Sequence, residues 1–242
     1  IIKPILKGRE INKYISNWEN DYIVFVPWHF PLEDDDKIVG ASDKAEKEFS
    51  KKYKPLYDYL KSHKEGLSKR NQDETGIRYE WYALQRSAAT YRDEFLREKI
   101  IWKRIGSQLR FSYSDSEIYC LDSTCIATGE KIKYLTALLN SKLCNYQLFE
   151  SAPKTGMGDL IISVQALEPL LVYYPTDKEQ NQIEKLVDEI LKKKKSNQDT
   201  TAIEKEIDVL VYKLYELDYE EVKIIDKDFW LSEGEYENIK TD

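Results

Sequence analysis

The segment "KIIWKRIGSQLRFSYSDSEIYCLDSTCIATGEKIKYLTALLNSKLCNYQLFES", residues 99–151, decides the fold of this chain. Its first part contains the runs "KIIWKRI", "RFSYSD" and "EIYCLDSTCIAT", which are rich in β-branched and aromatic residues and are separated by polar turns. Such runs are typical of strands, and their short spacing predicts an antiparallel meander. Residues 130–151 place leucines on one helical stripe, so we expect one long helix that packs on the sheet.

Upstream of this segment, the sequence predicts one strand and one helix. "DYIVFVPWHFP", residues 21–31, is apolar, is bounded by acids and prolines, and favours a strand. In "YKPLYDYLKSHKEGLSKR", residues 53–70, apolar side chains recur at helical spacing and Pro55 falls near a first turn. This pattern indicates an amphipathic helix with a basic C-terminal end.

Downstream, "VQALEPLLVYYP" (164–175) favours a short turn or helix followed by a strand. Residues 176–195 and 200–217 are two amphipathic segments that predict a helical hairpin or a coiled-coil arm. The predicted class is therefore α+β, with a small mixed or antiparallel sheet and packed helices in residues 1–175. A C-terminal helical hairpin or arm in residues 176–242 follows.

Composition indicates a folded protein. Hydrophobic residues make up 41% and aromatic residues 12% of the 242 residues, which is enough to build a core. Because no apolar run is long enough to cross a bilayer and no signal-peptide pattern opens the chain, we expect a soluble, cytoplasmic protein without membrane partners. The opening "IIKPILKGREINKY" reads like the middle of a longer polypeptide, so a piece of a larger chain is expected.

No motif in the sequence indicates catalysis. We find no glycine-rich phosphate loop, nucleophile elbow or paired-histidine motif. The three cysteines are an odd number, and the two histidines, His29 and His63, lie far from them in sequence, which disfavours disulfides and a zinc site. A magnesium-dependent nuclease that uses the acids of "EDDDK", residues 33–37, is an alternative, although strand-borne acids are missing.

Charge is unevenly distributed along the chain. The net charge is -7, but residues 51–110 carry 15 Lys and Arg against 8 Asp and Glu, which is +7. Residues 1–50 and 111–242 together carry 22 basic against 36 acidic residues, which is -14. Because nucleic acids bind to local basic surfaces, the middle of the chain is a candidate for contact with phosphates.

Basic and aromatic residues alternate in two stretches of this middle segment, "RYEWYALQR" (78–86) and "KIIWKRI" (99–105). Arginine can contact guanine with two hydrogen bonds, glutamine can contact adenine in the same way, and lysine holds phosphates. The pattern suits DNA recognition. It suits equally a fold in which the tryptophans belong to the core and the charges lie in solvent.

The order of the motifs resembles a known family. "IIKPILKGREINKY", "YKPLYDYLKSHKEGLSKR", "WYALQRS", "KIIWKRI", "YCLDSTCIATGE", "KYLTALLNSKLCNYQLFES", "APKTGMGD" and the C-terminal helical segment follow one another. This succession resembles the C-terminal target-recognition domain of TaqI-like adenine-N6 DNA methyltransferases, above all the type IIG restriction–modification enzymes. The resemblance implies a sequence-specific module for double-stranded DNA with no catalysis of its own.

In that family a methylase domain precedes the recognition domain and carries the S-adenosylmethionine site and the "NPPY"-type motif, neither of which is present here. The resemblance thus implies no cofactor in this chain, and S-adenosylmethionine, with magnesium if a nuclease is attached, in the parent. The expected partners are double-stranded DNA and the methylase domain of the same parent chain. Half of a type I specificity subunit and a coiled-coil protein-interaction module remain alternatives.

The resemblance and the basic residues give a set of candidate DNA-binding positions. The family's tryptophan–leucine–arginine element matches Trp81, Leu84 and Arg86, and its basic strand position matches Arg104. In the loop 153–158, two glycines would let the backbone turn sharply near DNA with Met157 reaching into a groove, whereas a helix C-cap is the alternative. The candidates are Lys7, Arg9, Arg70, Arg78, Trp81, Gln85, Arg86, Lys103, Arg104, Lys154, Gly156 and Gly158.

Overall fold

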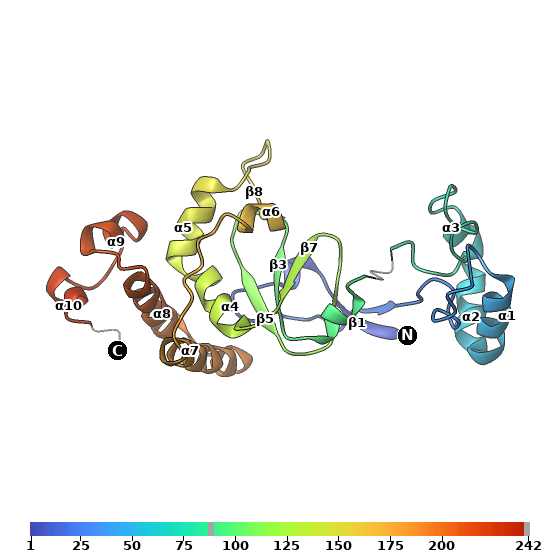
Figure 1. Ribbon diagram of the computed structural model, residues 1–242, viewed down its shortest axis with the longest axis horizontal. Helices are drawn as coiled ribbons and strands as arrows, with labels where there is room; N and C mark the ends of the chain where they lie inside the picture. Colours follow the sequence, from blue (N-terminus) through green and yellow to red (C-terminus); the bar gives the residue numbers. More distant parts are fainter. Residues whose placement is uncertain (87–89, 240–242) are drawn as a thin grey trace. The chain divides into compact units, whose positions relative to one another are not determined.

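The computed structural model describes residues 1–86 and 90–239, and the chain divides into two compact units (Figure 1). Unit 1 comprises residues 1–4 and 22–95, and unit 2 comprises residues 5–21 and 96–242. None of the described helices combines the length and the apolar character that crossing a bilayer requires.

Strand β1 (Ile2–Leu6) contributes to both units. Its first residues pair antiparallel with β2 (Tyr22–Val24), and its last two pair parallel with β6 (Tyr119–Cys120). The strand expected over residues 21–31 is therefore only three residues long. Two prolines, which cannot donate to a ladder, lie in the remainder, and residues 28–31 form a turn.

Unit 1 is built on short helices and a core of aromatic rings. The helices are α1 (Asp43–Lys52), α2 (Lys54–Ser62), α3 (Lys64–Ser68) and the 3-10 turn η2 (Arg92–Leu96). The helix expected over residues 53–70 breaks at His63, and Pro55 occupies the first turn of α2 as predicted. The buried cluster consists of Val26, Phe30, Phe49, Leu60, Tyr79, Trp81, Tyr82 and Ala83.

The main sheet of unit 2 has the order β5-β3-β7, with β3 (Lys99–Lys103) between β5 (Phe111–Ser114) and β7 (Thr124–Thr128). Both pairs are antiparallel, as expected, but the predicted meander is wrong because consecutive strands do not lie in sequence order. The connection from β5 to β7 runs through β6, which pairs with β1. This detour returns β7 to the other side of β3.

Two helices, α4 (Ile132–Asn140) and α5 (Lys142–Ser151), replace the single helix expected over residues 130–151. Ser141 is extended between them, and its hydroxyl accepts a hydrogen bond from the Cys144 N–H. The carboxylate of Asp208 accepts a hydrogen bond from the Lys142 N–H at 2.8 Å, which satisfies a second amide at the start of α5. Capping therefore favours the break over a continuous helix.

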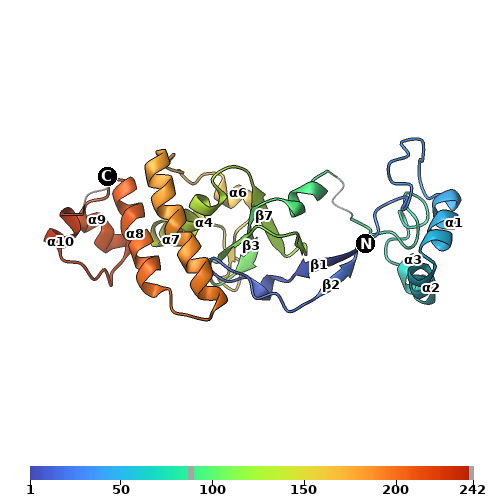
Figure 2. The ribbon, with the colours of Figure 1, turned by 90° about the horizontal axis from the view of Figure 1, so that it is seen from below.

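The C-terminal helices pack on the rest of unit 2. Helices α7 (Asp177–Lys195) and α8 (Thr201–Leu214) lie side by side (Figure 2), and α7 also contacts α4 while α8 contacts α5. Helices α9 (Tyr219–Ile225) and α10 (Glu233–Glu237) follow. The apolar faces of α7 and α8 share one buried cluster with Tyr14, Tyr134 and Leu138.

This packing corrects one expectation. The two apolar faces are covered by the chain itself, so α7 and α8 form a helical hairpin but not a coiled-coil arm with a free seam. Unit 2 runs through residue 175, and the domain boundary expected there stays a prediction.

The segment 164–175 begins with α6 (Val164–Leu167) and contains no strand, so the strand expected there is wrong. Its backbone forms hydrogen bonds with tyrosine hydroxyls and not with a neighbouring strand. The Tyr173 N–H donates to the Tyr215 hydroxyl at 3.0 Å, and the Tyr134 hydroxyl donates to the Tyr173 carbonyl at 2.9 Å. With β4 (Ile105–Gly106) paired to β8 (Leu160–Ile161) and the 3-10 turn η1 (Gly8–Glu10), the architecture is α+β, as predicted.

Candidate nucleic-acid interface

In unit 1, the candidates Arg70 and Trp81 hold the fold. Trp81 is 6% exposed, and its indole N–H donates to Glu46 at 2.8 Å. The Arg70 guanidinium donates to the carbonyls of Trp81 at 2.9 Å and Ala83 at 2.8 Å. Trp81 therefore has a structural role in the buried core, and the exposed Arg70 has one on backbone carbonyls, while contact of either side chain with DNA stays a prediction.

The remaining unit 1 candidates differ in solvent exposure and in whether they form an ion pair. Arg78 forms an ion pair with Glu74 at 2.8 Å and lies over the Trp28 ring. Gln85 is half-buried and Arg86 is exposed at the end of the first described range. Arg86 is therefore the basic side chain of this group that solvent reaches without an ionic partner in the described chain.

In unit 2, three candidates are exposed cations. Lys103 ends β3, Arg104 connects β3 to β4, and Lys154 lies in the loop after α5. Within residues 1–86 and 90–239, none of them forms an ion pair. An unpaired cation is the better phosphate ligand, because binding breaks no existing pair.

Backbone pairing places these three cations at one end of the sheet. Lys103 runs along Gly106, because a Cβ on that glycine would lie 3.6 Å from the lysine Cδ. Gly106 pairs with Leu160, and Leu160 forms a β-bridge with Lys154. The Arg104 N–H donates to the Ser123 carbonyl at 2.9 Å, which joins the β6–β7 turn to this end.

The structure adds Arg110, which the sequence reasoning missed. Phe111 pairs with Trp102, so the residue before it lies level with Lys103 at the same end of the sheet. Arg110 is exposed and donates to the side-chain oxygens of Asn12, at 3.2 Å, and Gln108. Its position as the first residue of the predicted strand run "RFSYSD" was the available signal. We call Lys103, Arg104, Arg110 and Lys154 the strand-end surface.

Lys7 and Arg9 are already neutralised by acids of the same segment. Lys7 forms an ion pair with Asp21 and Arg9 with Glu19, and the hydrogen bond that Arg9 donates to the Glu19 carboxylate raises the pKa of Arg9. The Lys7 side chain is half-buried, whereas Arg9 is largely exposed. Both cations can contact phosphate only by exchanging these partners.

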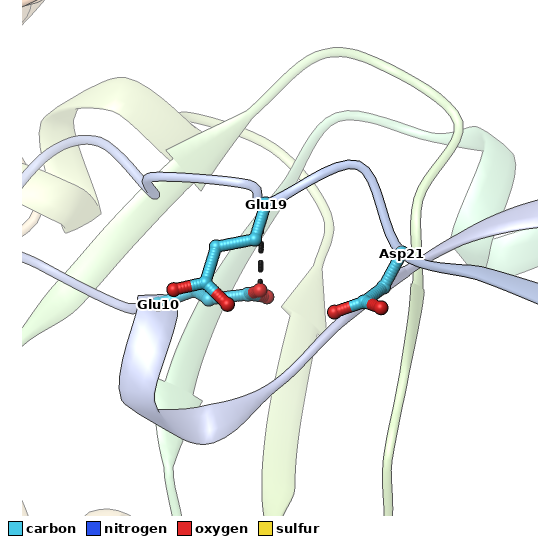
Figure 3. A group of neighbouring side chains, drawn as sticks. All are labelled: Glu10, Glu19 and Asp21. Carbon is cyan, nitrogen blue, oxygen red and sulfur yellow. Dashed lines mark hydrogen bonds between the residues drawn. The ribbon is translucent and has the colours of Figure 1, made fainter.

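Glu10, Glu19 and Asp21 form a close acidic group (Figure 3). The buried Glu10 carboxylate accepts the Lys7 N–H at 2.7 Å and the Glu19 N–H at 3.4 Å, so it caps backbone amides. The other two acids have the cationic partners described above. These contacts account for the group without a metal ion. In contrast, the "EDDDK" acids do not converge into such a group in the described structure.

The loop after α5 is a β-hairpin and not a helix C-cap. Helix α5 ends at Ser151, the following Ala152 is extended, and the chain turns only four residues after Ala152. Gly158 has φ +87°, which favours glycine, whereas Gly156 does not lie in the left-handed region. The sharp turn therefore requires one of the two glycines. Figure 1 shows this hairpin in yellow, extending past the sheet between α5 and β8.

The buried lysine and cysteines of unit 2 have structural roles. Lys99 is 0% exposed, burial lowers its pKa, and its ammonium donates to the carbonyls of Arg97 at 2.7 Å and Ser116 at 2.8 Å. All three cysteines are free thiols, and burial raises the pKa of Cys120 to about 11 and of Cys144 to about 12. Thiols held protonated are poor nucleophiles.

A cavity of about 510 Å³ lies at the other end of the sheet, by Tyr113 and Ser114. Its walls carry both signs of charge, with Lys133 paired to Asp188 at 2.7 Å and with Asp115, Lys192 and Lys195 also in the lining. The neighbouring lysines of α7 pair with helix acids, Lys193 with Glu189 and Lys194 with Glu204. This end therefore offers phosphate a less uniform charge than the strand-end surface.

Comparison with known proteins gives one family match. A family model described as the TaqI-like C-terminal specificity domain spans residues 3–170. A search of curated proteins found no significant match to the chain. The family match covers both units through α6 and includes the whole strand-end surface.

Proposed function

Because the chain belongs to the family of TaqI-like C-terminal specificity domains, we propose that it recognises a particular sequence in double-stranded DNA on behalf of a restriction–modification enzyme. The match over residues 3–170 is the observation that carries this proposal. The domain would select the site and leave the covalent chemistry to another part of the enzyme.

The strand-end surface is our candidate for the contact with DNA. Lys103, Arg104 and Lys154 form no ion pair within the described residues, and Arg110 extends the surface across the sheet end. Lysine would hold phosphates and fix the register, while the planar arginine guanidinium can donate two hydrogen bonds to guanine. Arg86 is the corresponding candidate in unit 1.

For the parent enzyme we propose an adenine-N6 methylase domain as the partner of this module, as in type IIG restriction–modification enzymes. Such a methylase would flip the target adenine out of the stack, and this module would hold the flanking duplex during that step. S-adenosylmethionine would bind to that domain, and magnesium to a nuclease domain if one is attached. This chain would supply only the grip and the sequence selection.

The test is fluorescence anisotropy of the 242-residue chain with labelled duplexes of mixed sequence, titrated from about 50 to about 200 mM salt. We expect salt-sensitive binding. The double variant Lys103→Glu/Arg104→Glu should weaken it by at least about tenfold at about 100 mM salt and flatten the salt dependence, since each lost phosphate contact lowers the slope by about one.

The matched control is Lys185→Glu/Lys227→Glu, which changes the net charge equally at two exposed lysines of α7 and of the segment after α9. If both double variants weaken binding to the same extent, general charge and not the strand-end surface explains the affinity. Absence of DNA binding by the wild-type chain at low salt would contradict the proposed function itself.

A further inference from the structure

The hairpin of residues 153–161 ends in one isolated apolar side chain. Met157 is 95% exposed and lies between Gly156 and Gly158. Neither glycine has any heavy atom within 4 Å of the position that a Cβ would take. At the apex, methionine is thus the large side chain that a surface approaching the hairpin meets first.

The hairpin fixes the position of this side chain. The Gly158 N–H donates to the Thr155 carbonyl at 2.9 Å, and the Thr155 N–H donates to the Asp159 carbonyl at 2.8 Å. The Asp159 N–H also donates to the Thr155 hydroxyl at 3.1 Å. With Gly158 left-handed, this is a tight turn followed by a bulge, a common closed form of a three-residue loop. Met157 is therefore presented on an ordered turn.

The dimensions and charges of the hairpin suit the major groove. Paired strands lie about 4.8 Å apart, and the major groove, about 12 Å wide, admits a two-stranded ribbon. Lys154 is exposed on the ascending strand, and Leu160, opposite to it, connects through Gly106 to the end of β3. Cations at the base of the hairpin could hold phosphates while its apex reaches base edges.

The chemistry of the methionine side chain limits which group of a base pair Met157 can contact. The thioether is a weak acceptor and no donor, so it cannot match the hydrogen-bonding pattern of a base edge. The thymine C5-methyl is the apolar group that a base pair shows in the major groove. Resting on the proposed function, we propose that Met157 is a specificity-determining residue that contacts a thymine methyl group in the recognised sequence.

The test starts from duplexes selected from a randomised library by the wild-type chain. Each thymine of the selected sequence is replaced in turn by deoxyuridine, which removes the methyl and keeps every hydrogen bond. At one position we expect affinity to fall about fourfold, the size of one apolar methyl contact. Met157→Ala should bind the thymine duplex about fourfold more weakly and should not distinguish thymine from deoxyuridine there.

Two further variants complete the design. Met157→Leu keeps an apolar side chain and should retain most of the thymine preference, whereas Val39→Ala, at a 94% exposed valine of unit 1, should change nothing. Because Met157 is almost fully exposed, circular dichroism and thermal unfolding of Met157→Ala should match wild type. The salt dependence of its binding should also match, since no phosphate contact is lost.

Binding that is salt-sensitive but equally affected by deoxyuridine in wild type and Met157→Ala would overturn the inference and leave the proposed function intact. A selected sequence without thymine, bound equally by wild type and Met157→Ala, would also overturn it. If the wild-type chain selects no sequence and binds no duplex, the proposed function fails and the inference fails with it.

Discussion

The stretches "RYEWYALQR" (78–86) and "KIIWKRI" (99–105) look alike as sequence and act differently in the two units. In the first, Trp81 is buried and Arg78 is paired, so these two residues serve the fold of unit 1 and only Arg86, at the end of the stretch, is exposed without an ionic partner in the described chain. In the second, Trp102 is buried, but Lys103 and Arg104 lie exposed at the sheet end with no ionic partner among the residues that the structure describes. The alternation of basic and aromatic residues thus indicates little until burial and pairing are known.

The largest expected effect lies in the first stretch. Trp81→Ala should lower the free energy of unfolding of unit 1 by about 3–5 kcal/mol, because it opens a cavity among aromatic rings and removes one of the two hydrogen bonds that Glu46 accepts from Trp81 and Tyr57. Chemical denaturation measures the loss, and hydrogen exchange should locate it in residues 22–95. Trp230→Ala, at a 41% exposed tryptophan, should cost less than half as much. Equal losses would mean that Trp81 is not a core residue.

The next prediction concerns buried charge in unit 2. Asp208 is buried and accepts the Lys142 N–H, and burial raises its pKa to about 6 despite nearby Lys13 and Lys142, while Asp226 adds to the rise. A carboxyl with a raised pKa in the folded state gives stability that is present at low pH. That stability is lost as the pH rises through about 6.

Relative to Asp208→Asn, wild type should therefore gain up to about 1.4 kcal/mol per pH unit as the pH falls from about 6 to about 4, about 3 kcal/mol in total. Asparagine keeps an oxygen acceptor for the Lys142 N–H, so the difference isolates the titration. The measurement is the free energy of unfolding of both proteins across this window. Parallel pH curves would show that Asp208 titrates at its ordinary value.

A pair of arginine variants compares the two units directly. Arg70→Ala should cost about 2 kcal/mol of stability, because it removes charged donors from the Trp81 and Ala83 carbonyls, and should leave DNA affinity within about twofold. Arg104→Ala should leave stability unchanged and weaken DNA binding about tenfold. Denaturation and anisotropy on the same samples test both. If Arg70→Ala weakened DNA binding and Arg104→Ala did not, our assignment of roles would be reversed.

The smallest expected effect is on DNA affinity and comes from removing the ionic partners of Lys7 and Arg9. The variant Glu19→Gln/Asp21→Asn removes their ionic partners and should strengthen DNA binding by about threefold at low salt, because the freed cations can contact phosphate. Asp35→Asn, which loses a pair with Lys44 in unit 1, is the control. Anisotropy at about 50 mM salt measures both. No gain over this control would place Lys7 and Arg9 outside the DNA contact.

Local sequence signals worked where one element decides its own structure. The β-branched runs around Ile100 and Ile126 became strands, and Pro55 began a helix as predicted. Local signals failed where a residue far away in the sequence determines the local structure. The break at Ser141 depends on capping by Asp208, and the missing strand before Pro175 depends on hydroxyls of Tyr134 and Tyr215.

The candidate site shows the same division. Lys103, Arg104 and Lys154 could be named from sequence because each is a basic residue in a recognisable motif. Arg110 is also a basic residue of a predicted strand run, but only the antiparallel register places it level with Lys103. Trp81 and Arg70 were candidates from sequence, and only the packing of unit 1 showed that they hold its core and its backbone carbonyls.

By itself, the sequence determined the α+β class, the positions of most helices and the resemblance to a specificity domain. These follow from periodicity and from the order of motifs, which are local properties of the chain. Tertiary structure alone decided the strand order, the end of the sheet at which cations gather and which cations stay unpaired. Those features arise from contacts between residues far apart in the chain, where burial and the register of pairing, not residue type, set the outcome.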